Sequence, residues 1–146
     1  MFPASEYQER LTRLQNNIQA AGLDAYVVRT DTNVIYLTGV DYHSMERPVI
    51  MVVPVSGEPI LIVPRMEQEQ LSAAVIVHKM EVYWEVEAKP GRGWTESLVK
   101  VLGSAKSVAI EPLVEADMVA ALDSFDWQVL PLVEDLRVIK SAAEVA

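Results

Sequence analysis

The sequence contains no cysteine at all. Disulfide bonds, thiolate nucleophiles and cysteine-ligated metal sites are therefore excluded, and a reducing cytoplasm is the compartment that we expect. Histidine is almost as scarce. The two histidines, His43 and His78, belong to no His-Glu-x-x-His pattern that would place two metal ligands on one helix face. The glycine-rich phosphate-binding motifs and the Gly-x-Ser-x-Gly nucleophile turn are missing too, so Asp41, His43 and Ser44 make a poor catalytic triad.

Long apolar runs and basic clusters are also absent. The longest apolar run, residues 48–55, has the length of a strand and falls well short of the roughly 18 residues of a membrane-spanning helix. The first residues, MFPASEYQERL, lack the basic and apolar regions of a signal peptide. The net charge of −9, with 21 acidic against 12 basic residues, opposes binding to nucleic acid or to an anionic membrane. We expect neither as a partner.

The composition that remains is typical of a globular domain. A chain of 146 residues, 51% hydrophobic and 23% charged, fits one domain with a buried core. Near the amino end, apolar residues recur at spacings of three and four and predict an amphipathic helix. They are Tyr7, Leu11, Leu14, Ile18 and Ala21. We expect a capping box of Ser5 and Gln8 to begin this helix and Gly22 to end it.

Six short runs rich in β-branched residues predict strands. They are residues 25–29, 49–55, 60–63, 80–83, 107–110 and 127–130. Gly57, between the second and third runs, supplies the positive φ of a tight hairpin. Further helices are predicted at residues 31–37, capped by Asp31 or Thr32 and stopped at Gly39, and at 65–74, 95–102 and 115–122. The fold class is therefore α/β: a mixed six-stranded sheet with one antiparallel hairpin and helices on both faces.

Two charged segments have a simple structural interpretation. Glu81, Glu85 and Glu87 share one face of a strand and predict a solvated acidic edge that discourages strand pairing, rather than a metal site. Gly91 and Gly93 lie beside cations in residues 89–93, which we interpret as a crossing loop and not as an anion site.

One polar, irregular segment, residues 29–48, follows the first strand and is the place where a function is most expected, because loops on a rigid scaffold carry binding sites. Asp31 and Asn33 are interpreted as turn caps, and Tyr36 and Leu37 as residues that pack inward. For His43 and Arg47 the residues alone leave a functional and a structural role equally open.

The last residues, LRVIKSAAEVA, contain a second capping box, Ser141 with Glu144. A helix beginning at Ser141 has only five residues before the sequence ends, too few to be stable alone. We therefore expect residues 137–146 to be a connector and the first turn of a further domain, and residues 1–136 to be the domain itself. Val138, Ile139 and Val145 are expected to expose apolar surface through which the chain could self-associate.

Several of these stretches together resemble the N-terminal domain of the creatinase/prolidase family, which includes Xaa-Pro aminopeptidases, Xaa-Pro dipeptidases and creatinases. The resemblance covers nearly the whole chain. The segments that carry it are TNVIYLTGV, ERPVIMVVPVSGEPILIVP, RMEQE and LRVIKSAAEVA. In the last of them, an Arg-x-x-Lys-Ser-x-x-Glu stretch that leads into the family's catalytic domain corresponds to Arg137, Lys140, Ser141 and Glu144.

The resemblance implies a ribonuclease H-like topology without that enzyme's chemistry, a homodimer, and no catalysis or cofactor in this chain. It also implies a C-terminal partner domain in which Asp, Asp, His, Glu and Glu residues hold two divalent metal ions (Mn, Co or Zn). By analogy, this domain closes over the active site, and a loop with His43, Glu46 and Arg47 reaches the substrate pocket, where an arginine can grip a carboxylate.

Three functions remain open at this point. The chain is the accessory domain of an Xaa-Pro metallopeptidase, the same domain of a creatinase-like small-molecule hydrolase, or a stand-alone binding or dimerisation module. The metal-ligand set of the expected C-terminal domain distinguishes the first two, because creatinase-like members lack the complete set.

Overall fold

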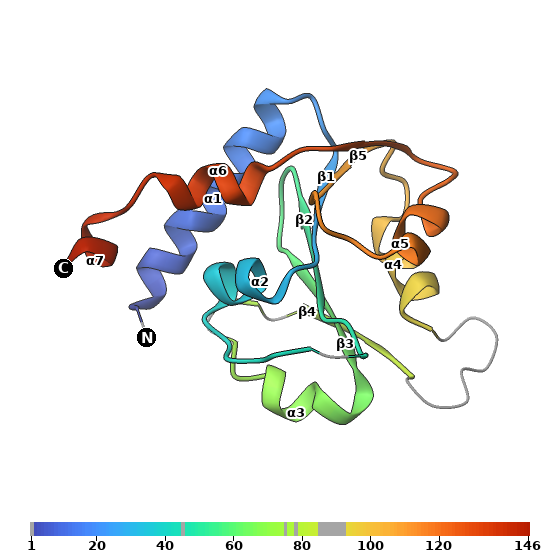
Figure 1. Ribbon diagram of the computed structural model, residues 1–146, viewed down its shortest axis with the longest axis horizontal. Coiled ribbons are helices and arrows are strands. Elements are labelled where there is room, and N and C mark those ends of the chain that lie inside the picture. The colour runs from blue at the N-terminus through green and yellow to red at the C-terminus, as the bar shows by residue number, and fades with distance from the viewer. Residues whose placement is uncertain (1, 45, 75, 78, 85–92) are drawn as a thin grey trace.

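The computed structural model of the chain describes residues 2–44, 46–74, 76–77, 79–84 and 93–146 (Figure 1). Several sequence predictions lie outside these residues. They are those for His78, for Glu85 and Glu87, and for the part of the 89–93 loop that contains Lys89, Gly91 and Arg92.

Helices and strands alternate along most of the chain. The helices are α1 (Ala4–Ala20), α2 (Asp31–Thr38), α3 (Gln68–Leu71), α4 (Trp94–Leu102), α5 (Ala116–Ala121), α6 (Leu132–Val138) and α7 (Ala142–Val145), and a 3-10 turn, η1 (Arg65–Glu67), precedes α3. The strands are β1 (Ala25–Val28), β2 (Ile50–Pro54), β3 (Ile60–Pro64), β4 (Lys79–Tyr83), β5 (Ser107–Ile110) and β6 (Asp126–Val129).

The strands form one mixed six-stranded sheet, as the sequence predicts, and the structure gives their order as β4-β3-β2-β1-β5-β6. β2 and β3 are the predicted antiparallel hairpin, and Gly57 between them has a φ of 99°. β1 is central: it pairs antiparallel with β2 and parallel with β5. Both outer pairs, β3 with β4 and β5 with β6, are parallel. The carboxyl ends of β1 and β5 therefore lie side by side.

Each face of the sheet buries its own core, because successive side chains on a strand point to opposite faces. Tyr26 and Val28 of β1 pack with α1, α2, α3 and α6, whereas Ala25 and Val27 pack with α4 and α5. Figure 1 shows α1 and α6 lying against one another on the first of these faces. The prediction of helices on both faces is confirmed.

Two helix starts differ from the sequence predictions. Ser5 lies inside α1, whose N-terminal flanking residue is Pro3, so the predicted capping box of Ser5 and Gln8 is wrong. Proline fits just before or at the first helical position because its missing N–H is not needed there. At α2, Thr30 is the flanking residue and makes no side-chain capping bond, so Asp31 and Thr32 do not cap this helix.

Other helix boundaries follow the predictions more closely. Gly22 and Gly39 have φ of 71° and 75° and end α1 and α2 as expected. The predicted helix at residues 65–74 is shorter and is divided into η1 and α3. Helix α6 was not predicted. The capping box of Ser141 and Glu144 is confirmed, with both of its hydrogen bonds formed.

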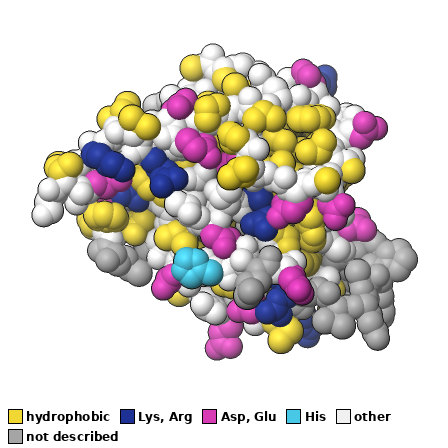
Figure 2. All heavy atoms as spheres, viewed as in Figure 1, with side chains coloured by type: hydrophobic (Ala, Val, Ile, Leu, Met, Phe, Trp, Pro, Cys, Tyr) yellow, Lys and Arg dark blue, Asp and Glu magenta, His cyan; other side chains and the backbone are white. Residues whose placement is uncertain are grey.

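The surface exposes some large apolar side chains. Trp127 and Val129 lie on the edge strand β6, and Val138, Ile139 and Val145 are exposed as expected. Figure 2 shows hydrophobic side chains gathered along the upper part of one face, where Figure 1 has the chain running towards α6. Within the residues described, none of the helices combines the length and the hydropathy needed to cross a bilayer.

Candidate functional site

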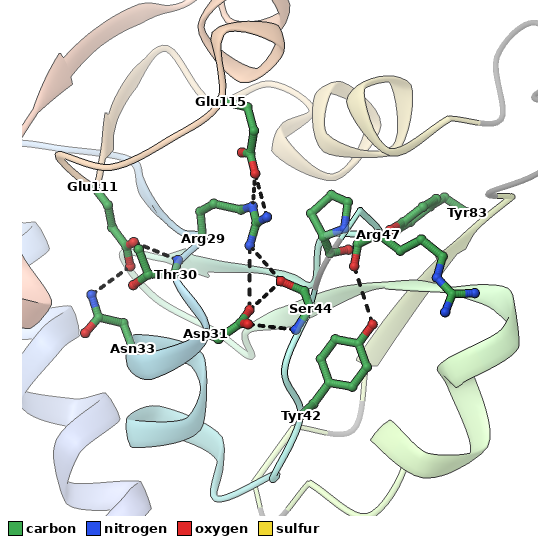
Figure 3. Close-up of polar contacts among 11 residues, drawn as sticks. Arg29, Thr30, Asp31, Asn33, Tyr42, Ser44, Arg47, Tyr83, Glu111 and Glu115 are labelled. Atoms are coloured by element: carbon green, nitrogen blue, oxygen red, sulfur yellow. Dashed lines mark hydrogen bonds and ion pairs between the residues drawn. The ribbon is translucent and has the colours of Figure 1, made fainter.

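The adjacent carboxyl ends of β1 and β5 carry an extensive set of polar contacts (Figure 3). Arg29, Thr30 and Asp31 directly follow β1, and Glu111 directly follows β5. In open α/β sheets, ligands bind preferentially in the crevice outside the carboxyl ends of the strands. We therefore take this edge of the sheet as the candidate site.

Arg29 is the centre of one group of contacts, which we call the Arg29 cluster: Arg29, Asp31, Ser44 and Glu115. The guanidinium is 11% exposed, and its Nε donates to Glu115 Oε1 at 2.6 Å. Its Nη1 donates to Ser44 Oγ at 3.3 Å and lies 3.7 Å from Asp31 Oδ1. The cation is thus held between two carboxylates from different elements, one at the start of α2 and one before α5.

Asp31 joins the loop after α2 to the end of β1. Its Oδ2 accepts the backbone N–H of Ser44 at 2.7 Å, and its Oδ1 accepts the Ser44 hydroxyl at 2.6 Å. The Ser44 oxygen then accepts a hydrogen bond from Arg29, so both its donor and its acceptor functions are used. Charged partners make these bonds stronger than neutral ones. The loop that contains His43 is therefore fixed to the sheet at Ser44.

The Arg29 cluster forms one side of an open pocket of about 420 Å³. Its lining residues are Arg29, Thr30, Asp31, Ser44, Leu113, Val114 and Glu115. Leu113 stands at the surface with 75% of its area exposed. A cation, two carboxylates and an apolar wall suit the recognition of a polar group. In the described part of the chain, no three His, Cys, Asp or Glu side chains are grouped so that they could hold a metal ion.

A second network lies beside the Arg29 cluster and meets the pocket at Thr30. Glu111 is fully buried, and its carboxylate accepts the backbone N–H of Thr30 at 2.8 Å and the amide of Asn33 at 3.0 Å. Burial raises the pKa of Glu111, and these hydrogen bonds only partly offset that effect. The Asn33 amide also donates to Glu134 at 2.9 Å, and Arg137 donates to the Asn33 side-chain oxygen at 3.1 Å.

This network ties α6 to the end of the sheet. Tyr26 lies close by on β1, and its hydroxyl donates to the carbonyl of Leu130 at 2.6 Å. Burial, together with the nearby carboxylates of Glu111 and Glu134, raises the pKa of this hydroxyl well above its usual range. The contacts join α2, β5 and α6 from positions far apart in the sequence, and through Thr30 they also hold one lining residue of the pocket in place.

The three predicted site residues lie outside the Arg29 cluster. They are His43, Glu46 and Arg47. The His43 side chain is 79% exposed, and its Nε2 is 3.4 Å from an Asp41 oxygen. Glu46 is exposed. Arg47 is partly buried and lies 3.3 Å from Glu67 on η1. Figure 3 shows the Arg47 side chain extending away from the Arg29 cluster.

His43, Glu46 and Arg47 thus share a loop, but His43 and Arg47 contact different neighbours. The loop returns to the sheet at Pro48, whose carbonyl accepts the buried Tyr83 hydroxyl at 2.7 Å. The role of His43, Glu46 and Arg47 at a substrate pocket stays a prediction. The structure adds residues that the sequence did not single out, namely Arg29, Glu111 and Glu115. The sequence did carry one signal for Arg29 and Glu111. Each is a charged residue directly after an apolar strand, the position at which α/β sheets tend to bind ligands.

Comparisons with known proteins agree on one family. A sequence profile of the creatinase/prolidase N-terminal domain matches residues 10–139. An uncharacterised peptidase of Staphylococcus epidermidis is 24% identical over 136 residues, which are 93% of this chain and 38% of that protein.

Solved structures are similar over the same region. The dipeptidase PepE of Mycobacterium ulcerans is 25% identical with a TM-score of 0.75, and the match covers 99% of this chain and 40% of that one. The creatinase/prolidase N-terminal domain of an X-Pro dipeptidase from Streptococcus pyogenes is 21% identical with a TM-score of 0.73, and the match covers 90% of this chain and 98% of that one. The chain thus spans about two fifths of the length of the Staphylococcus and Mycobacterium proteins.

Proposed function

The chain belongs to the creatinase/prolidase N-terminal domain family, and we propose that it acts as the non-catalytic N-terminal domain of a proline-specific metallopeptidase, an Xaa-Pro dipeptidase or aminopeptidase. In this proposal, a C-terminal domain holds two divalent metal ions, Mn, Co or Zn, through Asp, Asp, His, Glu and Glu residues. When bound there, such a metal pair would supply an activated water and polarisation of the scissile carbonyl. The present chain, in the cytoplasm, contributes to a homodimer and closes over the active site.

The observation that carries this proposal is the pattern of coverage. The chain aligns with about two fifths of a dipeptidase and with almost the whole of a separately solved N-terminal domain of an X-Pro dipeptidase. This pattern supports a domain that works beside a larger catalytic body. In the proposal, residues 1–136 form that domain and residues 137–146 lead into the catalytic one.

The loop that contains His43 and Arg47 supports a contact with substrate. Its His43 side chain is exposed, the adjacent Ser44 binds Asp31 at the start of α2, and Pro48 accepts the Tyr83 hydroxyl of β4. A loop that is attached to the scaffold and exposes polar side chains suits a binding role. In the proposal, Arg47 exchanges Glu67 for a substrate carboxylate, and His43 donates a hydrogen bond to the bound peptide.

The first experiment compares the 146-residue chain with the longer protein that includes the proposed catalytic domain. With manganese present, we expect the longer protein to hydrolyse Xaa-Pro dipeptides and the 146-residue chain to have no activity. Hydrolysis by the chain alone would refute the accessory role. A longer protein that lacks the full metal-ligand set and hydrolyses a small guanidino compound instead would favour the creatinase-like alternative.

The second experiment tests the loop. In the longer protein, His43→Ala and Arg47→Ala should each raise KM for the dipeptide about 10- to 100-fold, since a charge-assisted hydrogen bond is worth roughly 1.5–3 kcal/mol. Lys100→Ala is the control, because Lys100 is an exposed cation that pairs with Glu81 on another part of the surface. Unchanged KM in both loop variants would exclude these two residues from substrate binding.

A further inference from the structure

Helix α1 carries a charged pair that is almost completely buried. The side chains of Glu6 and Arg10 are 8% and 3% exposed, and Arg10 Nε donates to Glu6 Oε1 at 3.1 Å. The guanidinium lies 4.8, 5.3 and 4.0 Å from the ring centroids of Phe2, Tyr7 and Tyr36. Its Nη1 donates to the Tyr36 carbonyl at 2.7 Å. Arginine is rarely buried so fully unless its charge is paired. Glu6 pairs with Nε and the Tyr36 carbonyl with Nη1, so Nη2 is the nitrogen that takes a further partner.

The partner comes from the other end of the chain. The Ser141 hydroxyl donates to Glu6 Oε1 at 2.7 Å, across a sequence separation of 135 residues. Glu144 Oε1 lies 3.7 Å from Arg10 Nη2, and this nitrogen is buried without a hydrogen bond among the described atoms. Glu6 thus faces Ser141, and Arg10 faces Glu144, the two polar side chains of the Ser-x-x-Glu segment.

Helix α7 is too short to be stable by itself. It has four residues, none of them buried, whereas isolated helices need about 12–15 residues to be even marginally stable in water. The apolar residues around it, Val138, Ile139 and Val145, are 78%, 64% and 74% exposed. The capping box satisfies backbone groups at the start of α7 but does not attach α7 to the domain. The contacts with Glu6 and Arg10 provide that attachment.

We propose that Glu6 and Arg10 form a docking site for the side chains of Ser141 and Glu144. The site recognises a hydroxyl followed three residues later by a carboxylate, and it fixes α7 in one orientation on α1. This inference stands on contacts within the chain and does not depend on the peptidase activity. One consequence rests on the proposed function: docking of α7 would hold the first turn of the catalytic domain, and so its orientation, against α1.

The test is amide hydrogen exchange in the 146-residue chain, followed for the amides of Val145 and Ala146. These amides donate to Ser141 and Ala142 carbonyls within α7. In the wild-type chain we expect protection that a synthetic peptide of residues 139–146 lacks. Arg10→Met should reduce this protection about tenfold or more, because it removes the buried cation that faces Glu144.

Two further variants separate docking from capping and from general charge effects. Glu144→Gln keeps the capping box, in which glutamine also serves, but removes the charge that faces Arg10, so protection should again fall several-fold. Glu144→Gln also tests the proposal by itself if the Arg10→Met variant does not fold. Lys140→Met is the matched control, since Lys140 is 55% exposed and lies 4.0 Å from Glu144. Exposed pairs of this kind are weak, and protection should change less than about twofold.

Several results would overturn the proposal. Wild-type protection no greater than that of the peptide would mean that α7 is not docked. Protection unchanged in Glu144→Gln, or lost equally in Lys140→Met, would mean that Arg10 does not recognise Glu144. Protection that rises with protein concentration would mean that the segment docks on a second copy, which would replace the intramolecular site by an intermolecular one.

Discussion

Gly39 is needed for two reasons: its backbone is left-handed, and there is no space for a side chain. The energetic cost of each can be measured separately. It ends α2 with a φ of 75°, and its N–H donates to the Ile35 carbonyl at 2.8 Å. A Cβ at this position would lie 2.8 Å from Cζ, 2.9 Å from Oη and 3.1 Å from Cε2 of Tyr7. Tyr7 is 4% exposed, so its ring has little room to move away. Gly22 has a similar φ of 71°, but a Cβ there would meet no atom within 4 Å.

The two glycines therefore separate backbone strain from steric overlap. A left-handed conformation costs an alanine about 1–2 kcal/mol, and this cost applies to Gly22→Ala and Gly39→Ala alike. Gly39→Ala must also displace the buried Tyr7 ring, and overpacking of this kind typically costs a further ~1–3 kcal/mol. We expect Gly22→Ala to lower the free energy of unfolding by about 1–2 kcal/mol and Gly39→Ala by about 2–5 kcal/mol.

Urea unfolding followed by circular dichroism measures both values, with an unchanged slope as evidence that the unfolded state is comparable. A cycle with Tyr7→Leu tests the cause, because the smaller side chain relieves the overlap and should bring the cost of Gly39→Ala close to that of Gly22→Ala. Equal destabilisation by the two glycine variants in the wild-type background would refute the reasoning.

Two other residues near the candidate site give further predictions. Burial raises the pKa of Glu111 above its ordinary value of 4.5, so its contribution to stability is complete below pH 4.5 and is lost as pH rises through the higher native pKa. Urea unfolding at several pH values should show this decline in the wild-type chain and a flatter dependence in Glu111→Gln; equal slopes would contradict it. Tyr83→Phe leaves the Pro48 carbonyl without its buried donor and should cost about 1–3 kcal/mol, measured by the same assay; a loss below about 0.5 kcal/mol would mean that water replaces the hydroxyl.

The strands and the hairpin of the sheet could be predicted because short, local stretches of sequence specify them. Buried strands are short runs of β-branched residues, and Gly57 marks the hairpin by a conformation that few other residues adopt. Helix α6 escaped prediction because seven residues after Pro131 give too little periodicity to separate a helix from a connector. The start of α1 was misplaced because a Ser-x-x-Gln pattern can lie inside a helix as well as at its beginning.

The candidate site follows from the sequence only in part. The segment after β1 was interpreted as polar and irregular, but its first part, Asp31–Thr38, forms the helix α2. Asp31 and Asn33 were interpreted as local caps, and Leu37 as an inward-facing residue. Leu37 is fully buried, but Asp31 binds Ser44, and Asn33 binds Glu111, 78 residues away. Partners at such separations are determined by the pairing of β1 with β5, which no local pattern specifies.

The strand order also has a consequence for synthesis of the chain on the ribosome. β1 to β4 are four of the six strands and are complete once residue 83 has emerged, whereas β1 takes its second neighbour only from residues 107–110. During the interval, one edge of the central strand stays unpaired, and α1 lacks the α6 surface that finally covers it. Exposed strand edges of this kind attract other chains. A chain that folds during synthesis therefore passes through a stage in which its central, fully buried strand has one unpaired edge.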